Sequence, residues 1–444
     1  MNRLPREFLL KMERLLGEEF PAFEASCGHP PFRGIRLNPL KCGLQTLSRA
    51  LPGLEPAPFS PLAYYLPQTA EKIGLMPLHH AGAFYVQEPS ASSAVTAMDP
   101  RPGEKILDLC AAPGGKSTQI AALLAGRGLL WSNEVVRGRA DILLSNLERM
   151  GAANAVVSCC QPEKLCRALS GWFDRVLVDA PCSGEGMFRK SEEAVRDWSP
   201  AHVAACAVRQ LAILQSASLA VKENGVLVYS TCTFSEEENE GVISAFLKAR
   251  EDFELIDPGL AFGRPALLPQ ARRIFPMDGG EGHFVAVLRR NSANPPAAAE
   301  YVPAKGRNVG MAEELYRQVF RSGPERRIEE RRDAFFLLPA LLPALGGLNV
   351  LRAGVLLGRL RPGRVEPEHA LFMAADPSKL NRHVDFTSDS PEIRAFLRGE
   401  ELAVRTDGIQ GYTGVSVEGV MLGFGKCSGG RLKNKYPKGL RNAV

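Results

Sequence analysis

The sequence predicts an α/β protein built on a doubly wound parallel sheet, with smaller domains at both ends of the chain. The chain has 444 residues, of which 45% are apolar and 23% charged, a composition typical of globular proteins rather than of disordered or collagen-like chains. At about 150 residues per domain, this length indicates about three domains that can each bury a core. Between Gly103 and Leu288, short apolar runs alternate with amphipathic stretches, the pattern of parallel strands joined by helices.

The strands of this sheet are expected where short apolar runs end in polar or glycine-rich turns. Helices are expected between them, most clearly over Ser117–Leu124 and Val203–Val221. The expected strands are Ile106–Cys110, Gly128–Ser132, Ala155–Ser158, Arg175–Asp179 and Val226–Ser230.

The regions on either side of the sheet have different patterns. Residues 1–50 are expected to form helices around an apolar face, followed by a short strand in GIRLNPLK (34–41). The segment NSANPPAAAEYVPA (291–304) is rich in proline and alanine, which predicts a linker.

Beyond the linker we expect a charged helix over 308–333, mixed structure over 334–375 and short strands with glycine turns over 380–444. The domains predicted from these patterns are 1–95, 96–290, 308–375 and 376–444, with the linker at 291–307.

The basic excess of the chain lies in one short segment. The whole chain has 54 basic and 49 acidic residues; residues 1–100 carry 9 of each, residues 101–290 carry 22 and 23, and residues 291–444 carry 23 and 17. Six cations without an acidic residue in 426–444 account for the last difference, which predicts attraction of a polyanion to that end of the chain.

No targeting, membrane or metal signal stands out. The first 16 residues mix charges into an apolar pattern, unlike a signal peptide. The most apolar stretch, Phe335–Leu348, is too short and too often broken by proline and glycine to cross a bilayer. The ten cysteines lack the paired CxxC spacing of zinc sites, so we expect a reduced, cytoplasmic protein without a metal site or membrane attachment.

The segment LDLCAAPGGKST (107–118) has the pattern of a strand, a loop of small residues and the start of a helix. Such loops bind phosphates or adenosyl cofactors, because glycine and alanine let a ligand approach the backbone. A P-loop with the aspartate of LVDAP (177–181) as magnesium ligand is disfavoured. It would need glycine where Cys110 stands, and Pro113 removes one backbone amide.

A cofactor with a ribose but no polyphosphate instead predicts an acidic residue about 20 residues after the loop. Glu134 stands at that distance, at the end of LLWSNE. Taken alone, Glu134 fits a surface carboxylate as well as it fits a ribose ligand. Together with the loop, it favours S-adenosylmethionine over ATP as the cofactor.

Two cysteines follow neighbouring strands of the expected sheet, Cys182 in DAPCSGEGMFRK (179–190) and Cys232 in YSTCTFSEEENE (229–240). Because such strand ends meet at one edge of a parallel sheet, both thiols should converge with Asp179 beside the cofactor. Each lies in a polar loop, where a thiol is exposed. The following cysteines are instead interpreted as small buried apolar residues: Cys27, Cys42, Cys159, Cys166 and Cys206.

A thiol beside a methyl donor suits methylation of a pyrimidine at C5. Thiolate addition to C6 turns the ring into an enamine whose C5 can attack a sulfonium methyl group; a base then removes the C5 proton and the thiol is eliminated. Asp179 is placed to act at N3 and the exocyclic amine, although capping a turn is the simpler role for it. These residues leave open which cysteine is the nucleophile.

Four segments together resemble the Nop/Sun family of RNA cytosine-C5 methyltransferases. They are DLCAAPGGKS (108–117), DAPCSGEGMFRK, STCTFSEEENE (230–240) and RIFPMDGGEGHF (273–284). HAGAFYVQEPSASSA (80–94) and GGRLKNKYPKGLR (429–441) add a narrower likeness, to the branch that acts on small-subunit (16S) ribosomal RNA. The resemblance covers nearly the whole chain. It implies a Rossmann-like S-adenosylmethionine-dependent core, a small N-terminal α+β domain, a small C-terminal domain and a β-rich PUA-like domain.

The resemblance also implies roles for single residues. Cys232 would be the nucleophile that bonds to C6, Cys182 would assist breakdown of the covalent adduct, and Lys190 would lie near the target base. Where the family usually has an acidic or amide residue near the adenine, this chain has Cys159 or Cys160. The implied cofactor contacts are Cys110, Ala111, Ala112, Pro113, Gly114, Gly115, Lys116, Glu134 at the ribose, Arg139 and Asp179.

Three regions are candidates for holding RNA around a cytosine that is turned out of the folded strand. The segment 34–41 resembles an RNA-contacting segment of the family, through Arg36, Asn38 and Lys41, but equally suits an ordinary edge strand. The helix expected over 308–333 has near-balanced charge and is interpreted as a solvated face. The C-terminal segment is the stronger candidate, with Tyr436 as a stacking ring. Its cations are Lys426, Arg431, Lys433, Lys435 and Lys438.

The sequence thus predicts a monomeric S-adenosylmethionine-dependent RNA (cytosine-C5) methyltransferase whose substrate is 16S ribosomal RNA, naked or in the 30S subunit. Transfer RNA is the alternative substrate, because the catalytic motifs are shared. A P-loop ATPase is disfavoured by the loop spacing. A non-catalytic RNA-binding protein is disfavoured because both thiols, Asp179 and Lys190 are all present.

Overall fold

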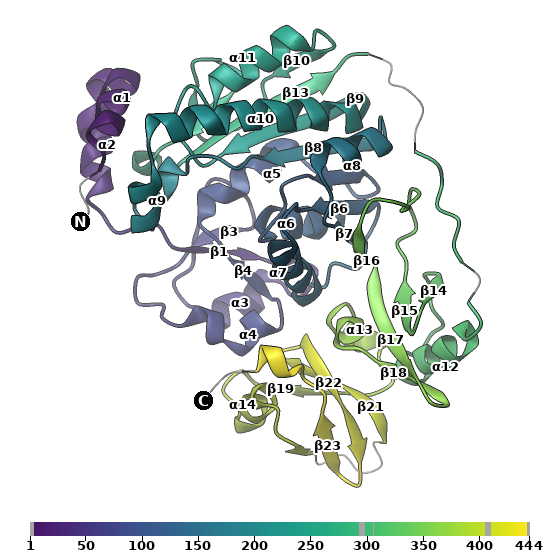
Figure 1. Cartoon of the computed structure of the whole chain (residues 1–444). Coiled ribbons are helices and arrows are strands. Elements are labelled where there is room, and N and C mark those ends of the chain that lie inside the picture. Colours follow the sequence, from purple (N-terminus) through teal and green to yellow (C-terminus); the bar gives the residue numbers. More distant parts are fainter. Residues whose placement is uncertain (1–3, 293–297, 305, 405–409, 442–444) are drawn as a thin grey trace.

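The computed structural model describes residues 4–292, 298–304, 306–404 and 410–441, and one ten-stranded sheet forms its centre (Figure 1). In this sheet β10 (Phe253–Ile256) pairs with β13 outside the main strand order. That order is β11 (Arg264–Pro265), β12 (Arg272–Ile274), β13 (His283–Arg290), β9 (Val221–Thr231), β8 (Phe173–Asp179), β5 (Lys105–Asp108), β6 (Leu129–Asn133), β7 (Ala155–Ser158) and β16 (Val350–Ala353).

The five strands predicted from sequence form the parallel middle of this sheet, from β9 to β7. β13 and β16 flank them in antiparallel pairs. The strand order reverses between β5 and β8, and ligands of open α/β sheets bind at the carboxyl ends beside such a reversal. The sequence therefore predicted the fold class.

Helices cover both faces of the sheet and bury two apolar layers. One layer includes Trp131, Phe173 and Phe246. The other includes Ile120 and Leu143. The first is covered by α8 (Pro162–Ala168), α10 (Pro200–Ala220) and α11 (Glu240–Ala249), and the second by α5 (Ser93–Met98), α6 (Gly115–Leu124) and α7 (Arg137–Arg149).

In the described part of the chain, α10 alone is long and apolar enough to cross a bilayer by length and composition. It packs against α8, α11, β8 and β9. Val203, Leu214 and Ala217 on this helix are buried, so its apolar composition is explained by its place on the sheet.

The N-terminal region contains α1 (Arg6–Leu16) and α2 (Phe20–Cys27), which bury Phe8 and Phe23 against Phe234 and Phe275 of the central domain. A small antiparallel sheet follows, with α3 (Leu44–Ala50) and α4 (Pro77–His80) beside it. Its strand order is β2 (Glu55–Pro56), β3 (Ala63–Tyr65), β1 (Gly34–Leu37) and β4 (Phe84–Val86).

The prediction of a helix over 308–333 is wrong beyond the first half of that range. α12 ends at Val319 (Val309–Val319), and Gly323 and Pro324 separate it from a strand. β16 from this region joins the central sheet beside β7, a pairing that the sequence pattern did not predict. The local sheet is β14 (Ile328–Arg331), β15 (Ala334–Leu337), β17 (Val355–Arg361) and β18 (Arg364–Pro367), followed by α13 (His369–Met373). Part of the expected linker, residues 293–297 and 305, lies outside the described residues.

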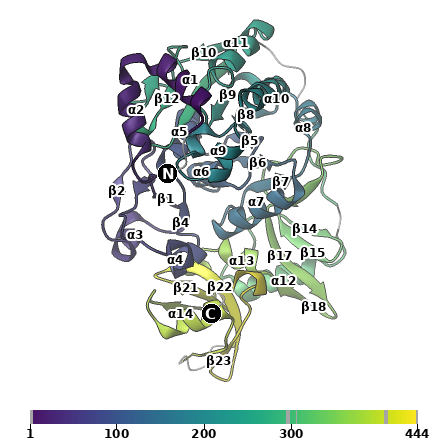
Figure 2. The same cartoon turned by 60° about the vertical axis from the view of Figure 1, so that its left-hand side comes forward.

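The last region forms short strands with glycine turns, as expected, together with α14 (Pro391–Arg398). It shares one apolar core with the N-terminal region, in which Ile35 and Leu78 meet Phe396 and Leu422. Figures 1 and 2 both show this C-terminal sheet against α4. Its strand order is β19 (His383–Phe386), β21 (Gly411–Val417), β22 (Val420–Ser428), β23 (Arg431–Asn434) and β20 (Leu402–Ala403).

Candidate active site

The loop between β5 and α6 is fastened from the side of α7. Asn146 Nδ2 donates to the carbonyl of Pro113 at 2.9 Å, and Arg139 donates to the carbonyl of Ala112 at 3.0 Å. Gly114 has a φ of +115°, a backbone conformation that residues with a side chain rarely adopt. A Cβ at this position would lie 3.3 Å from the side chain of Leu143. The loop predicted to hold the cofactor is therefore a fixed backbone surface.

Two carboxyl groups flank this loop. Glu134 is 3% exposed; its Oε1 accepts from the amide of Val136 at 3.0 Å and its Oε2 lies 3.3 Å from Arg139. Asp108 is fully buried, and burial raises its pKa to about 7. One oxygen of Asp108 accepts from Ser117 at 2.7 Å, whereas Oδ1 has no hydrogen-bond partner among the described residues. A buried carboxylate and an unpartnered buried oxygen beside a glycine loop fit a ligand that carries ribose hydroxyl and ammonium groups.

Asp179, at the end of β8, is held by an ion pair and a hydrogen bond. Lys116 Nζ lies 2.7 Å from Oδ2, and Ser230 Oγ donates to Oδ1 at 2.7 Å. Burial opposes the charge on Lys116, but the attraction of Asp179 outweighs it and raises the pKa of Lys116. The Asp179 side chain is thus held in place at the end of β8, near enough to Cys232 to act on its charge.

The two cysteines predicted to converge do so, with Cys182 Sγ and Cys232 Sγ 3.3 Å apart. The hydrogen bond that Cys182 donates lowers the pKa of Cys232, with further help from the charge of Lys116. The same hydrogen bond and burial raise the pKa of Cys182 well above its ordinary value. Cys232 is therefore the thiol that ionises more readily, and Cys182 keeps its proton.

Two buried glutamates fasten the cysteine loops to each other, and the sequence reasoning did not single them out. Glu238, which follows Cys232, accepts from the amide of Ser183 at 2.9 Å and from Gln210 at 2.7 Å. Glu185, which follows Cys182, accepts from the amide of Phe234 at 2.8 Å. It also accepts from Trp198 Nε1, Thr233 Oγ1 and Ser235 Oγ. Each loop thus carries a carboxylate that accepts hydrogen bonds from the other loop. The many Ser and Thr residues in both motifs were the sequence feature that could have predicted these buried acceptors.

Lys190 lies on the wall of a cleft of about 840 Å³ between the N-terminal helices and residues 185–192. Desolvation lowers the pKa of Lys190, against the attraction of Glu88 and Glu281. The charge of Lys190 also acts on Cys232, so this lysine belongs to the surroundings of the two thiols.

Near the expected adenine position, Cys159 and Cys160 differ in placement. Cys159 is partly exposed, and its thiol donates to the carbonyl of Val135 at 3.4 Å, next to Glu134. Cys160 is buried, and its amide donates to Asn133 at 3.0 Å. Cys110 lies in the cofactor loop, and burial raises its pKa well above the ordinary value.

The candidate RNA contacts of segment 34–41 point inward. Arg36 is 1% exposed and donates to the carbonyl of Gly115 at 2.6 Å and to Thr118 at 2.5 Å. Asn38 is equally buried and donates to the carbonyls of Gly82 and Met150. Lys41 donates to the carbonyl of Met373. Burial makes the expected RNA contact by Arg36 and Asn38 wrong, because these side chains join the N-terminal region to its neighbours. Lys41 is only partly buried, and its contact with RNA stays a prediction.

The C-terminal cations are exposed, whereas Tyr436 is not. Tyr436 is 2% exposed and its hydroxyl lies 3.0 Å from His80 Nδ1, so the expected stacking ring is part of a domain contact. Lys426 lies 5.6 Å from the centre of the Tyr412 ring, which is partly exposed. The exposed cations are Lys426, Arg431, Lys433, Lys435 and Lys438.

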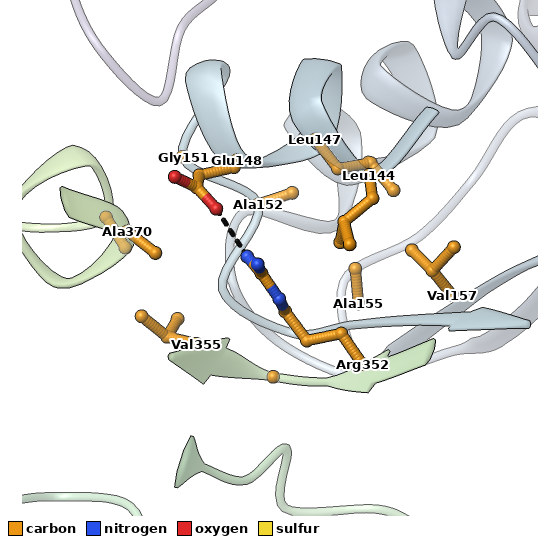
Figure 3. Close-up of a pocket in the computed structure, with 12 residues that line it drawn as sticks. Leu144, Leu147, Glu148, Gly151, Ala152, Ala155, Val157, Arg352, Val355 and Ala370 are labelled. Carbon is orange, nitrogen blue, oxygen red and sulfur yellow. Dashed lines mark hydrogen bonds and ion pairs between the residues drawn. The ribbon is translucent and has the colours of Figure 1, made fainter. Parts of the chain in front are cut away.

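A smaller pocket, of about 20 Å³, lies between α7 and the C-terminal strands (Figure 3). Glu148 on α7 forms an ion pair with Arg352 of β16, and it also lies 3.3 Å from His369. Leu144 and Val355 close the apolar side. A space that holds about one water, beside an internal ion pair, is a joint between domains rather than a ligand site.

Comparison with known proteins identifies this arrangement. The family model of the 16S rRNA methyltransferase RsmB/F matches residues 95–289. The models of the N-terminal domain, the first C-terminal domain and the PUA domain of the 16S rRNA methyltransferase RsmF match residues 4–89, 312–374 and 384–442.

Two relatives named ribosomal RNA small subunit methyltransferase F match over nearly their whole length. The protein of Aeromonas salmonicida is 32% identical over 447 residues, covering 94% of this chain and 92% of its own. The protein of Klebsiella pneumoniae is 32% identical over 464 residues, covering 98% and 96%.

Among solved structures, a methyltransferase homologue from Pyrococcus horikoshii matches with a TM-score of 0.56 and 29% identity, covering 64% of this chain and 95% of its own. The structure of NSun6 from the same organism with SFG has a TM-score of 0.58 at 23% identity, covering 65% and 98%, and shows the shared fold. The methyltransferase core and the PUA domain are as the sequence predicted. The cofactor of this methyltransferase core is S-adenosylmethionine. The chain belongs to the family of 16S rRNA methyltransferases RsmB/F.

Proposed function

We propose that the protein methylates C5 of a cytosine in 16S ribosomal RNA through a covalent bond between Cys232 and C6. The observation that carries this proposal is the pair of thiols 3.3 Å apart, whose hydrogen bond lowers the pKa of Cys232. A thiolate is required to add to C6, and a thiol stabilised by a hydrogen-bond donor and a nearby lysine supplies one.

Asp179 is proposed to bind the Watson–Crick edge of the target base. Its carboxylate, fixed by Lys116 and Ser230, accepts a hydrogen bond from the exocyclic amine and stabilises the positively charged ring that forms when N3 takes a proton from solvent. Electron density then moves toward N3 as sulfur adds to C6. Lys190 is proposed to lie against the base from the side of the cleft.

The cofactor supplies a methyl group on a positively charged sulfur. Glu134 is proposed to accept from its ribose hydroxyls, because this carboxylate is buried at the end of β6. The loop from Cys110 to Lys116 offers backbone groups, and Arg139 holds both Glu134 and that loop. These residues would hold the methyl donor at the ends of β5 and β6, whereas Cys232 follows the end of β9.

Cys182 is proposed to act when the adduct breaks down. Its sulfur lies 3.3 Å from Cys232 Sγ, and the hydrogen bond between them raises the pKa of Cys182. The same hydrogen bond stabilises the sulfur as the C6–S bond breaks, which makes Cys232 a better leaving group.

The exposed cations of the C-terminal sheet are proposed to hold RNA phosphates, since the central domain has almost no net charge. We further propose a monomeric, cytoplasmic enzyme.

The test incubates the protein with labelled S-adenosylmethionine and, separately, with 16S ribosomal RNA, 30S subunits and transfer RNA. Nucleoside mass spectrometry identifies the product, and bisulfite sequencing locates it. The proposal expects 5-methylcytidine in 16S RNA. A different methylated nucleoside, or 5-methylcytidine in transfer RNA alone, would refute the reaction or the substrate, respectively.

A further inference from the structure

His283, the first residue of β13, lies at the end of the sheet where β9 leads into Cys232. The antiparallel ladder of β13 and β9 ends with the pair Phe284 and Thr231, so His283 and Cys232 are the next residues on the two chains. A Cβ added at Gly186 would lie 3.0 Å from the Cys232 carbonyl oxygen and 3.2 Å from the Cα of Gly282, which brings the two segments together. Alternation along β13 places His283 on the sheet face of Val285 and Val287, which belong to the apolar layer under α5 and α6.

Alternation along β9 places Val228 and Ser230 on the same face, and Cys232 follows the end of this strand. Val228 belongs to that apolar layer, and Ser230 on the same side donates to Asp179. The charges of Lys116 and Lys190 act on both His283 and Cys232.

A hydrogen-bond chain fixes which nitrogen of His283 carries a proton. Ser90 Oγ lies 2.9 Å from His283 Nδ1 and 2.7 Å from Glu88 Oε2. The Glu88 carboxylate also accepts from the amides of Ser90 and Ala91, so it takes the Ser90 hydroxyl proton as an acceptor. Ser90 Oγ must then accept from Nδ1–H.

The proton on Nδ1 leaves a lone pair on Nε2 of the neutral ring. Among the described residues, none forms a hydrogen bond with His283 Nε2. This atom is also not among the fully buried polar atoms that lack a partner. Burial and the two lysines lower the pKa of His283 well below its ordinary value, so the ring stays neutral. His283 thus presents an unused proton acceptor beside Cys232.

The proposed reaction needs such an acceptor after methyl transfer, because the C5 proton must leave. Cys182 is poorly suited to take it, since its thiol keeps its own proton. We propose that His283 Nε2 accepts the C5 proton of the methylated adduct, and that Ser90 and Glu88 position the ring for that step. This inference rests on the proposed function.

The step balances within the adduct and these side chains. The C5–H bond breaks and an Nε2–H bond forms; the freed electron pair forms the C5–C6 double bond. The C6–S bond breaks, and its pair stays on Cys232 sulfur, where the thiol of Cys182 donates to it. The imidazolium then passes its proton to solvent, which the charges of Lys116 and Lys190 favour.

The test compares full-length wild type, His283→Gln and Ser90→Ala under single turnover, with 16S RNA carrying tritium at C5 of cytosine. His202→Gln, on the exposed start of α10, is the matched control. Loss of a general base predicts roughly 100-fold slower tritium release for His283→Gln. Ser90→Ala keeps the ring and frees its orientation, so we expect a smaller loss of about tenfold.

The covalent adduct distinguishes this role from a structural one. In His283→Gln the adduct should accumulate with the labelled methyl group already attached, and with unchanged thermal unfolding. Wild-type tritium release in His283→Gln, or loss of adduct formation in both variants, would overturn the inference. If wild type forms no 5-methylcytidine, the proposed function fails instead, whatever the variants do.

Discussion

Cys182 and Cys232 come from loops that follow adjacent strands, and their sulfur atoms lie 3.3 Å apart. The hydrogen bond between them lowers the pKa of Cys232 and raises that of Cys182. The two cysteines therefore have different chemical roles. The thiol whose charge is stabilised is suited to attack, and the thiol that keeps its proton is suited to assist departure.

Replacement of each cysteine should therefore give opposite results. Cys232→Ala removes the attacking sulfur and should abolish both methylation and the covalent adduct. Cys182→Ala leaves the attacking sulfur but removes the donor that stabilises it on departure, so an SDS-stable protein–RNA adduct should accumulate. Denaturing gels with labelled RNA measure both. An adduct formed by Cys232→Ala and not by Cys182→Ala would reverse the two roles.

The pH dependence of thiol reactivity provides a second test. Because the hydrogen bond from Cys182 lowers the pKa of Cys232, the thiolate of Cys232 forms at lower pH than that of an ordinary cysteine. Iodoacetamide should alkylate Cys232 first, and its pH profile should shift upward in Cys182→Ala. Mass spectrometry of the two peptides gives the rates. The control is Cys27→Ala, because Cys27 lies in α2, outside the two motifs that contain Cys182 and Cys232. In this variant the pH profile for alkylation of Cys232 should match that of wild type.

Glu185 should matter for stability as well as for the position of the thiol loops. Glu185→Ala leaves the amide of Phe234 and the indole of Trp198 without their acceptor in a buried place. Unsatisfied buried donors cost about 1–3 kcal/mol each, so the free energy of unfolding should fall by at least about 2 kcal/mol. Urea unfolding measures it, with exposed Glu193→Ala as the control. Equal stability of the two variants would contradict the buried network.

Asp108 predicts a specific dependence of stability on pH. Its folded pKa of about 7 lies above the ordinary value of 3.8, so the folded state binds a proton more tightly than the unfolded state. Its contribution to stability is therefore complete below about pH 4 and is lost as the pH rises toward 7. Asp108→Asn should remove this part of the decline. Urea unfolding at pH 5 and pH 8 should show a smaller difference for the variant than for wild type.

The sequence predicted what depends on local pattern and failed where residue type does not report burial. The apolar runs and their turns located the parallel strands, and the polar loops after them located both thiols. Judged from sequence alone, an arginine such as Arg36 is a typical phosphate ligand. In this fold it is buried and donates to the carbonyl of Gly115. Tyr436 was misjudged for the same reason. The addition of β16 to the sheet depends on a pairing between distant segments, which no local pattern contains.

The shared core of the terminal domains changes how RNA binding should be tested. Removing the chain from residue 380 would expose Leu78, which packs against Leu422, so lost RNA binding could reflect damage to the N-terminal region. Lys426→Gln combined with Lys433→Gln changes only exposed, paired positions of β22 and β23. If both contact phosphates, the slope of log affinity against log salt concentration should become shallower by about 1.4 to 1.8. Filter binding of 16S RNA at several salt concentrations measures this slope. Arg364→Gln, which is exposed but paired with Glu366, is the control. An unchanged slope in the double variant would place the phosphate contacts elsewhere.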